Sequence, residues 1–239
     1  MSYKIIIDSC GELLERWKID EHIERAPLTL TVDGEDIVDD ETFDQAYFLK
    51  KVAASPNCPK SSCPSPEKYM EAFDCEADHV YAVTLSSNLS GSYNSAVLGR
   101  NLLLENKPEK KIHVFDSCSA SVGETLIALK IEECEKEGME FEKVVETVDK
   151  YIESQHTYFV LENLETLRKN GRLSNLKAFV ASALKIKPVM GSTPEGTITQ
   201  LDQARGINKA LVKMVDYVAK GAADSKNKVL GITHCNCPA

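Results

Sequence analysis

The stretch HVYAVTLSSNLSGSYNSAVLGRNLLLEN, residues 79–106, places a serine-rich turn between an apolar run and a helix-like run. The turn, from Thr84 to Ala96, carries five serines in thirteen positions. A short continuous apolar run between turn residues is typical of a buried strand. A strand-to-helix turn of this kind can bind an anion, because the first N–H groups of the helix point out of it. The stretch therefore predicts an anion-binding turn, and the rest of the chain decides what lies beside it.

Strand-like and helix-like runs alternate along the first two thirds of the chain. The apolar runs predict strands at Lys4–Ser9, Pro27–Gly34, 79–85 and Lys111–Ser117. The helical spacing predicts helices at 11–17, 41–55, 67–77, 96–106, 121–138 and 141–154. Alternation with apolar strands favours a mostly parallel sheet with helices on both faces. We expect an α/β fold with a Rossmann-like sheet in an N-terminal domain, residues 1–154.

The remaining residues have a different pattern. Residues 157–184 predict a strand, a helix, a turn stopped by glycine and another helix. Residues 185–206 predict two strands around a Pro-Glu-Gly turn. A helix over 208–222 then precedes a final strand, KVLGITH, at 228–234. This pattern predicts a smaller α+β domain over 155–239.

Three of the predicted strands in the first domain end in a hydroxyl residue. These residues are Ser9, Ser86 with Ser87, and Ser117. In open parallel sheets, ligands bind outside the carboxyl ends of the strands. Asp8 and Asp116 directly precede two of the serines, and we expect them to bind backbone N–H groups of neighbouring turns. An acid pair or a set of metal ligands is the alternative.

Two hydroxyl-rich helix entrances are candidates for an anion site. The first is Ser90 with Gly91 and Ser92, where glycine lets the backbone approach a ligand closely. The second is KSSCPSP, Lys60–Pro66. The plain alternative is that Ser90 or Ser92 is an N-cap, and Ser65, just before Pro66, is the clearest candidate for a structural cap.

Composition excludes several classes of protein. The chain has 239 residues and a net charge of −9, so no basic surface for nucleic acid is expected. No apolar stretch is long enough to span a membrane, and the N-terminus does not resemble a signal peptide, which predicts a cytoplasmic protein. The eight cysteines are then expected as thiols. Cys58 with Cys63, and Cys235 with Cys237, lack the paired spacing of most zinc sites, so we expect no metal.

Known catalytic and phosphate-binding motifs are missing from the sequence. It contains neither the P-loop pattern nor G-x-G-x-x-G. A serine hydrolase of small esters would use Ser90 or Ser92 with His234, the one histidine at the end of a predicted strand, but the G-x-S-x-G motif is absent. This hydrolase and a binding module for another small anion remain alternatives.

The motifs taken together resemble the DegV family over nearly the whole chain. IIIDSCGEL resembles its opening strand and Asp-Ser turn, and PLTLTVDGEDIVDD its second strand. KSSCPSP and LSGSYNSA stand where the family has Thr-Ser-Gln-Pro-Ser and Leu-Ser-Gly-Thr-Tyr-x-Ser-Ala. FDSCSASVGE, LRKNGRLS, KIKPVM and ARGINKAL follow in the order that the family has. No single motif is specific, but their common order is.

The resemblance implies a non-catalytic protein that binds a long-chain fatty acid, with no cofactor. The carboxylate would be held by the two serine-bearing loops and the acyl chain by an apolar tunnel. It also implies a carrier that presents the acid to a fatty-acid kinase. The ligand-binding residues that it implies are Ser61, Ser62, Ser90, Gly91, Ser92, Arg172 and His234.

The sequence departs from the family pattern at several positions. Ser61 replaces threonine, Cys63 replaces glutamine, and Asn170 replaces the first glycine of a pair. Family members continue beyond the last predicted strand with a further helix and strand. We therefore expect a truncated second domain here and a pocket that is open or incomplete.

Overall fold

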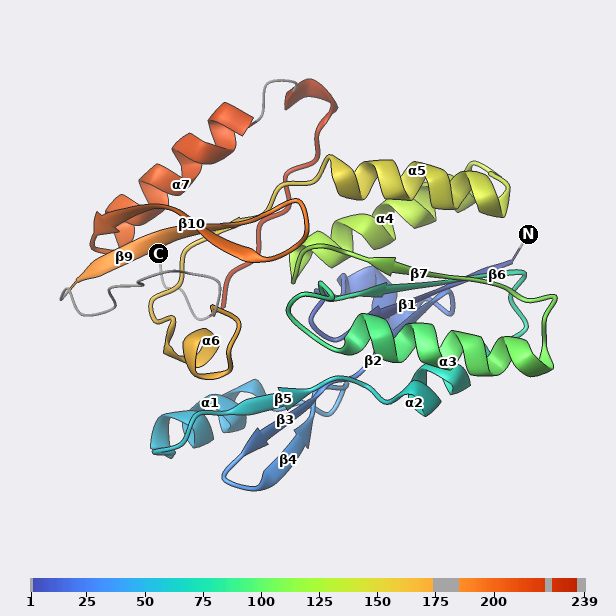
Figure 1. Cartoon of the computed structure of the whole chain (residues 1–239), viewed down its shortest axis with the longest axis horizontal. Helices are drawn as coiled ribbons and strands as arrows, with labels where there is room; N and C mark the ends of the chain where they lie inside the picture. The colour runs from blue at the N-terminus through green and yellow to red at the C-terminus, as the bar shows by residue number, and fades with distance from the viewer. Residues whose placement is uncertain (1, 174–184, 222–224, 236–239) are drawn as a thin grey trace. The chain divides into compact units, whose positions relative to one another are not determined.

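The computed structural model describes residues 2–173, 185–221 and 225–235, and the chain divides into two compact units (Figure 1). The first unit consists of Met1–Gln155 together with Gly231–Ala239. The second consists of His156–Leu230.

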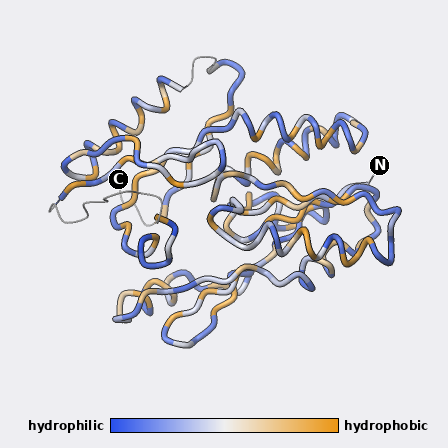
Figure 2. The backbone as a smooth tube through the Cα atoms, viewed as in Figure 1, coloured by the Kyte–Doolittle hydropathy of each residue, from blue (hydrophilic) through white to orange (hydrophobic). Residues whose placement is uncertain are grey.

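A four-stranded parallel sheet forms the centre of the first unit. Its strands are β2 (Ile23–Ala26), β1 (Tyr3–Asp8), β6 (His79–Thr84) and β7 (Lys111–Asp116), in that spatial order. All three neighbouring pairs are parallel, so the four carboxyl ends lie at the same edge. The predicted mostly parallel sheet is confirmed, and its central strands are the apolar runs seen in the sequence (Figure 2).

Helices cover both faces of this sheet. Successive side chains of a strand point to opposite faces, so each strand contributes to a core on either side. Ile5 and Ile7 of β1 pack in one core with residues of α4 (Val122–Lys136) and α5 (Phe141–Glu153). Ile6 packs in a second core, with residues of α2 (Pro66–Phe73) and α3 (Ser92–Asn106). β1 and β6 therefore carry apolar side chains on both faces, as a buried parallel sheet requires.

A small antiparallel sheet also belongs to the first unit. It has the order β4 (Glu35–Val38), β3 (Thr29–Val32), β5 (Lys60–Ser62). Asp33 and Gly34 connect β3 to β4, both with positive φ, as the predicted Asp-Gly turn requires. Between β4 and β5 runs α1 (Gln45–Ala54), whose N-cap is Asp44 and which ends before Pro56 as expected.

The second unit is a three-stranded antiparallel sheet with two described helices. The sheet has the order β10 (Ile198–Arg205), β9 (Ile186–Ser192), β8 (Tyr158–Phe159). The helices are α6 (Glu165–Lys169) and α7 (Ile207–Gly221). This is the expected α+β arrangement. The predicted helix after the glycine turn at Gly171 falls mainly on residues 174–184, outside the described residues.

Three predicted elements differ from the structure. The short helix expected at 11–17 is a 3-10 helix, η1, at Glu15–Ile19. Lys60–Ser62, expected at a helix entrance, forms β5 because it pairs with β3. The final strand predicted at 228–234 is wrong: a short 3-10 helix, η2, covers Ser225–Asn227, and the described residues after it have no strand partner.

Within the described part of the chain, none of the helices has the length and apolar character needed to cross a membrane.

Candidate functional site

The turns at the carboxyl edge of the parallel sheet are held together by the two predicted aspartates. The Asp8 carboxylate is buried and accepts hydrogen bonds from the backbone N–H groups of Cys10 at 3.0 Å and Leu85 at 2.8 Å. It therefore joins the turn after β1 to the turn after β6. This confirms that Asp8 organises neighbouring turns through their N–H groups.

Asp116 does the same on the other side of β6. One of its oxygens accepts from the N–H groups of Ser87 and Cys118, both at 3.1 Å. Because β6 lies between β1 and β7, the turn that follows it is bound by a carboxylate from each neighbour. The serine-rich stretch is thus held in place from both neighbouring strands.

Most of the serines at the strand ends build these turns. The Ser9 hydroxyl accepts from the Leu28 N–H at 3.0 Å, and Ser117 exchanges hydrogen bonds with the backbone of Ser119 at 3.1 Å. Ser9 and Ser117 are buried. These hydroxyls therefore form hydrogen bonds with buried backbone groups. A buried backbone group without a hydrogen-bond partner would destabilise the fold.

Ser92 has a structural task of the same kind. Its buried hydroxyl donates to the Asp8 carboxylate at 2.6 Å and lies 2.7 Å from the Tyr69 hydroxyl of α2. Burial beside Asp8 raises the pKa of Tyr69 well above its ordinary value, so Tyr69 stays protonated and donates to Ser92. These two bonds use the donor of the Ser92 side chain and one of its acceptor sites.

The Ser90 hydroxyl donates no hydrogen bond to the described residues. Its oxygen accepts from the Ser92 N–H at 3.2 Å, which occupies a lone pair but not the hydroxyl hydrogen. The N-cap of α3 is Gly91, which makes no side-chain cap. Ser90 therefore makes a capping hydrogen bond although the assigned N-cap of α3 is Gly91, so the plain interpretation of Ser90 as a cap stands beside the functional one, and Ser65 is the N-cap of α2 as predicted. The start of α3 retains N–H groups that have no partner within the helix.

The second serine-bearing segment lies beside this turn. The Ser95 hydroxyl of α3 donates to the Pro64 carbonyl at 2.5 Å. A Cβ atom on Gly91 would lie 3.3 Å from the sulfur of Cys63. The segment after β5 and the start of α3 are therefore neighbours, as an anion site shared by the two loops requires.

Ser61 and Ser62 are both exposed on β5, and neighbouring strand residues face opposite sides. Cys63 precedes a proline and is therefore extended, so Ser61 is expected to share its face. The sulfur of Cys63 faces the Gly91 turn. Ser61 is the member of the pair that this geometry directs toward the turn.

The other two predicted ligand-binding residues lie on separate segments. His234 is exposed in the first unit, next to Thr233, whose hydroxyl donates to Glu12 at 3.1 Å. Glu12 follows β1, so the segment of His234 reaches the same edge of the sheet. Arg172 belongs to the second unit, where its guanidinium donates to the Asn170 carbonyl at 3.3 Å.

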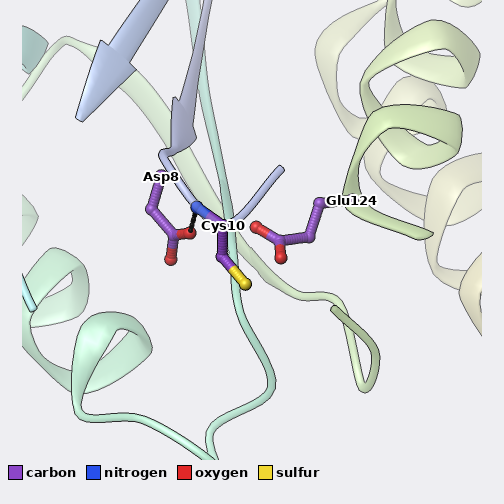
Figure 3. Close-up of side chains that lie close together, drawn as sticks. All are labelled: Asp8, Cys10 and Glu124. Carbon is purple, nitrogen blue, oxygen red and sulfur yellow. Dashed lines mark hydrogen bonds between the residues drawn. The ribbon is translucent and has the colours of Figure 1, made fainter. Parts of the chain in front are cut away.

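A cluster that the sequence did not indicate lies at the turn that follows β1. Asp8, Cys10 and Glu124 bring one ligand-type atom each within 4.8 Å of one another (Figure 3). Burial and the nearby Asp8 charge raise the pKa of Cys10 to about 11, so the thiol keeps its proton. Because the Asp8 oxygens already accept hydrogen bonds from the protein and Cys10 is a thiol, we interpret the three residues as a cluster of buried polar side chains.

In the part of the chain that the structure describes, the serine-rich turn does not contain a paired serine and histidine. A serine nucleophile needs a histidine within hydrogen-bond reach. Among the described residues, Ser90 and Ser92 make no hydrogen bond to a histidine ring, and the Ser92 hydroxyl is directed to Asp8.

Five of the described cysteines, Cys10, Cys63, Cys75, Cys134 and Cys235, are free thiols, while Cys237 lies outside the described residues.

The parallel sheet with helices on both faces makes this an α/β protein, and its serine-rich turns lie at the carboxyl edge, where open parallel sheets bind their ligands. Residues 2–239 match the family model described as "Uncharacterised protein, DegV family". The chain belongs to the DegV family. A DegV domain-containing protein of Streptococcus pneumoniae is 37% identical over 222 residues, covering 92% of this chain and 79% of the relative.

Solved structures resemble this chain closely. A DegV family protein from Ruminococcus gnavus, refined with vaccenic acid, is 58% identical with a TM-score of 0.92 and covers 95% of this chain and 81% of its own. The Fatty Acid Kinase (Fak) B3 protein of S. pneumoniae, loaded with linoleic acid, is 38% identical with a TM-score of 0.84 and covers 92% and 79%. Both structures carry a long-chain fatty acid.

Proposed function

We propose that this protein binds a long-chain fatty acid and holds its carboxylate between the Ser61 segment and the start of α3. The observation that carries the proposal is the contact of these two serine-bearing segments at Gly91. A carboxylate fits there because hydroxyl hydrogens and helix N–H groups favour negative charge. Relatives that carry vaccenic and linoleic acid support the choice of ligand.

The two ends of the ligand contribute differently to the free energy of binding. Burial of the acyl chain contributes about 0.8 kcal/mol for each CH₂ group. A hydrogen bond to the charged head group contributes about 1.5–3 kcal/mol. The chain therefore supplies most of the affinity, and the hydroxyls select an acid over other lipids.

A carrier role without catalysis agrees with this site. The side chains around it bind an anion, and no nucleophile is paired with a base there among the described residues. We propose that the protein presents the bound acid to a fatty-acid kinase, which a relationship to the Fak B3 protein supports. His234, in the same unit as this site, is proposed as a further head-group contact, and the role of Arg172, in the second unit, stays a prediction.

Purification from cells should yield the protein with a fatty acid bound. Native mass spectrometry is expected to show the mass of the chain plus one long-chain acid, and organic extraction should release that acid. Denatured protein from the same preparation serves as the control and should show the mass of the chain alone. An empty protein that also takes up no added fatty acid would contradict the proposal.

Replacing Ser90 with alanine should weaken fatty-acid binding about 10- to 150-fold, because a hydrogen bond to a carboxylate is lost. Ser61→Ala should act in the same direction. Titration calorimetry against one fatty acid measures both. The matched control is Ser65→Ala, which removes the cap of α2 and costs about 1 kcal/mol of stability but should leave affinity unchanged. Equal affinities of wild type and Ser90→Ala would remove Ser90 from the site.

A further inference from the structure

Glu124 is a buried carboxyl group whose nearest polar neighbours are the Asp8 carboxyl and the Cys10 thiol. It lies in the first turn of α4, is fully buried, and neither of its carboxyl oxygens has a hydrogen-bond partner among the described residues. In Figure 3 its carboxyl group points toward Asp8 and Cys10, which lie in the turn after β1. A buried ionised carboxylate that accepts no hydrogen bond is strongly unfavourable.

The groups around Glu124 make its ionisation harder still. The titratable groups that face it are Asp8 and Cys10. Tyr69 follows through Ser92, which bonds both Tyr69 and Asp8, and none of these groups is a cation. Burial raises the pKa of Glu124 well above its ordinary value, and the Asp8 charge raises it further. The start of α4 favours an anion, but no N–H group of the helix reaches the carboxyl oxygens.

Protonation of Glu124 removes its buried charge and, with it, the repulsion from the Asp8 charge. A carboxylic acid has an O–H donor, whereas a carboxylate only accepts. Asp8 is the acceptor that faces it. Two carboxyl groups whose oxygens lie within 4.8 Å of each other favour one shared proton. The acid form of Glu124 thus becomes a partner of Asp8 instead of a second negative charge.

We infer that Glu124 is a neutral carboxylic acid that shares its proton with the Asp8 carboxylate and so acts as a positioning residue for the ligand-binding turns. The positioning part rests on the proposed function, whereas the shared proton requires no ligand. Asp8 transmits the effect because it binds the Leu85 N–H and the Ser92 hydroxyl. Ser92 in turn holds the start of α3 beside Ser90.

The pH dependence of stability tests the proton directly. In the unfolded chain Glu124 ionises near its ordinary pKa of 4.5, while the folded chain keeps the proton. Above that pH the folded state holds one more proton than the unfolded state, so stability falls as pH rises toward the folded pKa. The ratio of unfolding constants, wild type over Glu124→Gln, should rise about tenfold per pH unit above about pH 5.5, until the pH reaches the pKa of Glu124 in the folded chain.

A control variant and an infrared spectrum accompany that measurement. Glu133→Gln, at an exposed position of the same helix, should give a ratio that stays constant with pH. The infrared spectrum of wild type at neutral pH should contain the carbonyl stretch of a protonated carboxylic acid, and Glu124→Gln should lack it. A constant ratio for Glu124→Gln, or a spectrum without that band, would overturn the inference.

Ligand affinity tests the positioning role separately. Glu124→Gln retains an N–H donor toward Asp8 and should bind fatty acid within about twofold of wild type. Glu124→Met fills a similar volume without a donor and should lose about tenfold in affinity while remaining folded. Equal affinities for the Met and Gln variants would overturn the positioning role. Failure of wild type to bind any fatty acid, with the pH-dependent ratio intact, would overturn the proposed function and support the shared proton.

Discussion

Replacing Asp8 with alanine lowers the free energy of unfolding by about 3–5 kcal/mol, the largest effect that we expect from a single change at the site. The carboxylate is 1% exposed and accepts from Cys10, Leu85 and Ser92. Each buried donor left without a partner costs about 1–3 kcal/mol. Loss of the proposed hydrogen bond from the Glu124 acid to Asp8 adds to this cost.

Chemical denaturation with urea measures the change, and Asp116→Ala is the matched control. Asp116 is half-buried and accepts two N–H groups, so its replacement should cost about 1–2 kcal/mol. Fatty-acid affinity should fall in the Asp8 variant even where it remains folded, because Ser92 and the start of α3 lose their anchor. Equal costs for the two aspartates would contradict the central place given to Asp8.

Gly99→Ala should be the second most damaging change, with a loss of about 2–3 kcal/mol. Gly99 is a buried residue of α3, where alanine would normally favour the helix. An added Cβ would instead collide with the Pro66 carbonyl oxygen and lie 3.0 Å from the Met70 nitrogen, both backbone atoms of α2. The two helices cannot separate without displacing the loops that precede them.

Thermal and urea unfolding test this prediction. The control is Asn101→Ala, an exposed position of the same helix, which should change stability by no more than about 0.5 kcal/mol. Because α2 and α3 begin at the two serine-bearing segments, the Gly99 variant should also bind fatty acid more weakly. A Gly99→Ala protein as stable as wild type would show that the helices pack less closely than described.

The central sheet could be predicted from the sequence because local sequence specifies it. Apolar runs that end in Asp-Ser define both the strand and the turn after it, and Asp8 and Asp116 bind the turns as expected. β2 was missed because the charges of Glu24 and Arg25 interrupt its apolar pattern at the sheet edge. An edge strand needs fewer apolar residues than a central one, so its sequence pattern is weaker.

Tertiary partners decided the elements that were predicted wrongly. Lys60–Ser62 is a strand only because β3 pairs with it. The run at 228–234 has the composition of a strand, but a strand requires a neighbour, and the described residues supply none there. Local composition carries no information about either outcome.

The candidate site was partly visible in the sequence. The hydroxyls were identified, but not their separation into turn builders such as Ser9 and Ser92 and a remaining donor, Ser90. Glu124 was missed because an acid in the first turn of a helix is ordinary. Only the fold places it against Asp8, across more than a hundred residues of sequence.

The most direct test of the account compares a long-chain fatty acid with the alcohol of the same chain length. Calorimetric titration of wild type and Ser90→Ala with both ligands separates recognition of the head group from burial of the chain. We predict that wild type binds the acid more tightly than the alcohol, and that Ser90→Ala loses at least about tenfold for the acid and little for the alcohol. An identical loss for both ligands, or no preference for the acid in wild type, would contradict the claim that these serine-bearing turns bind a carboxylate.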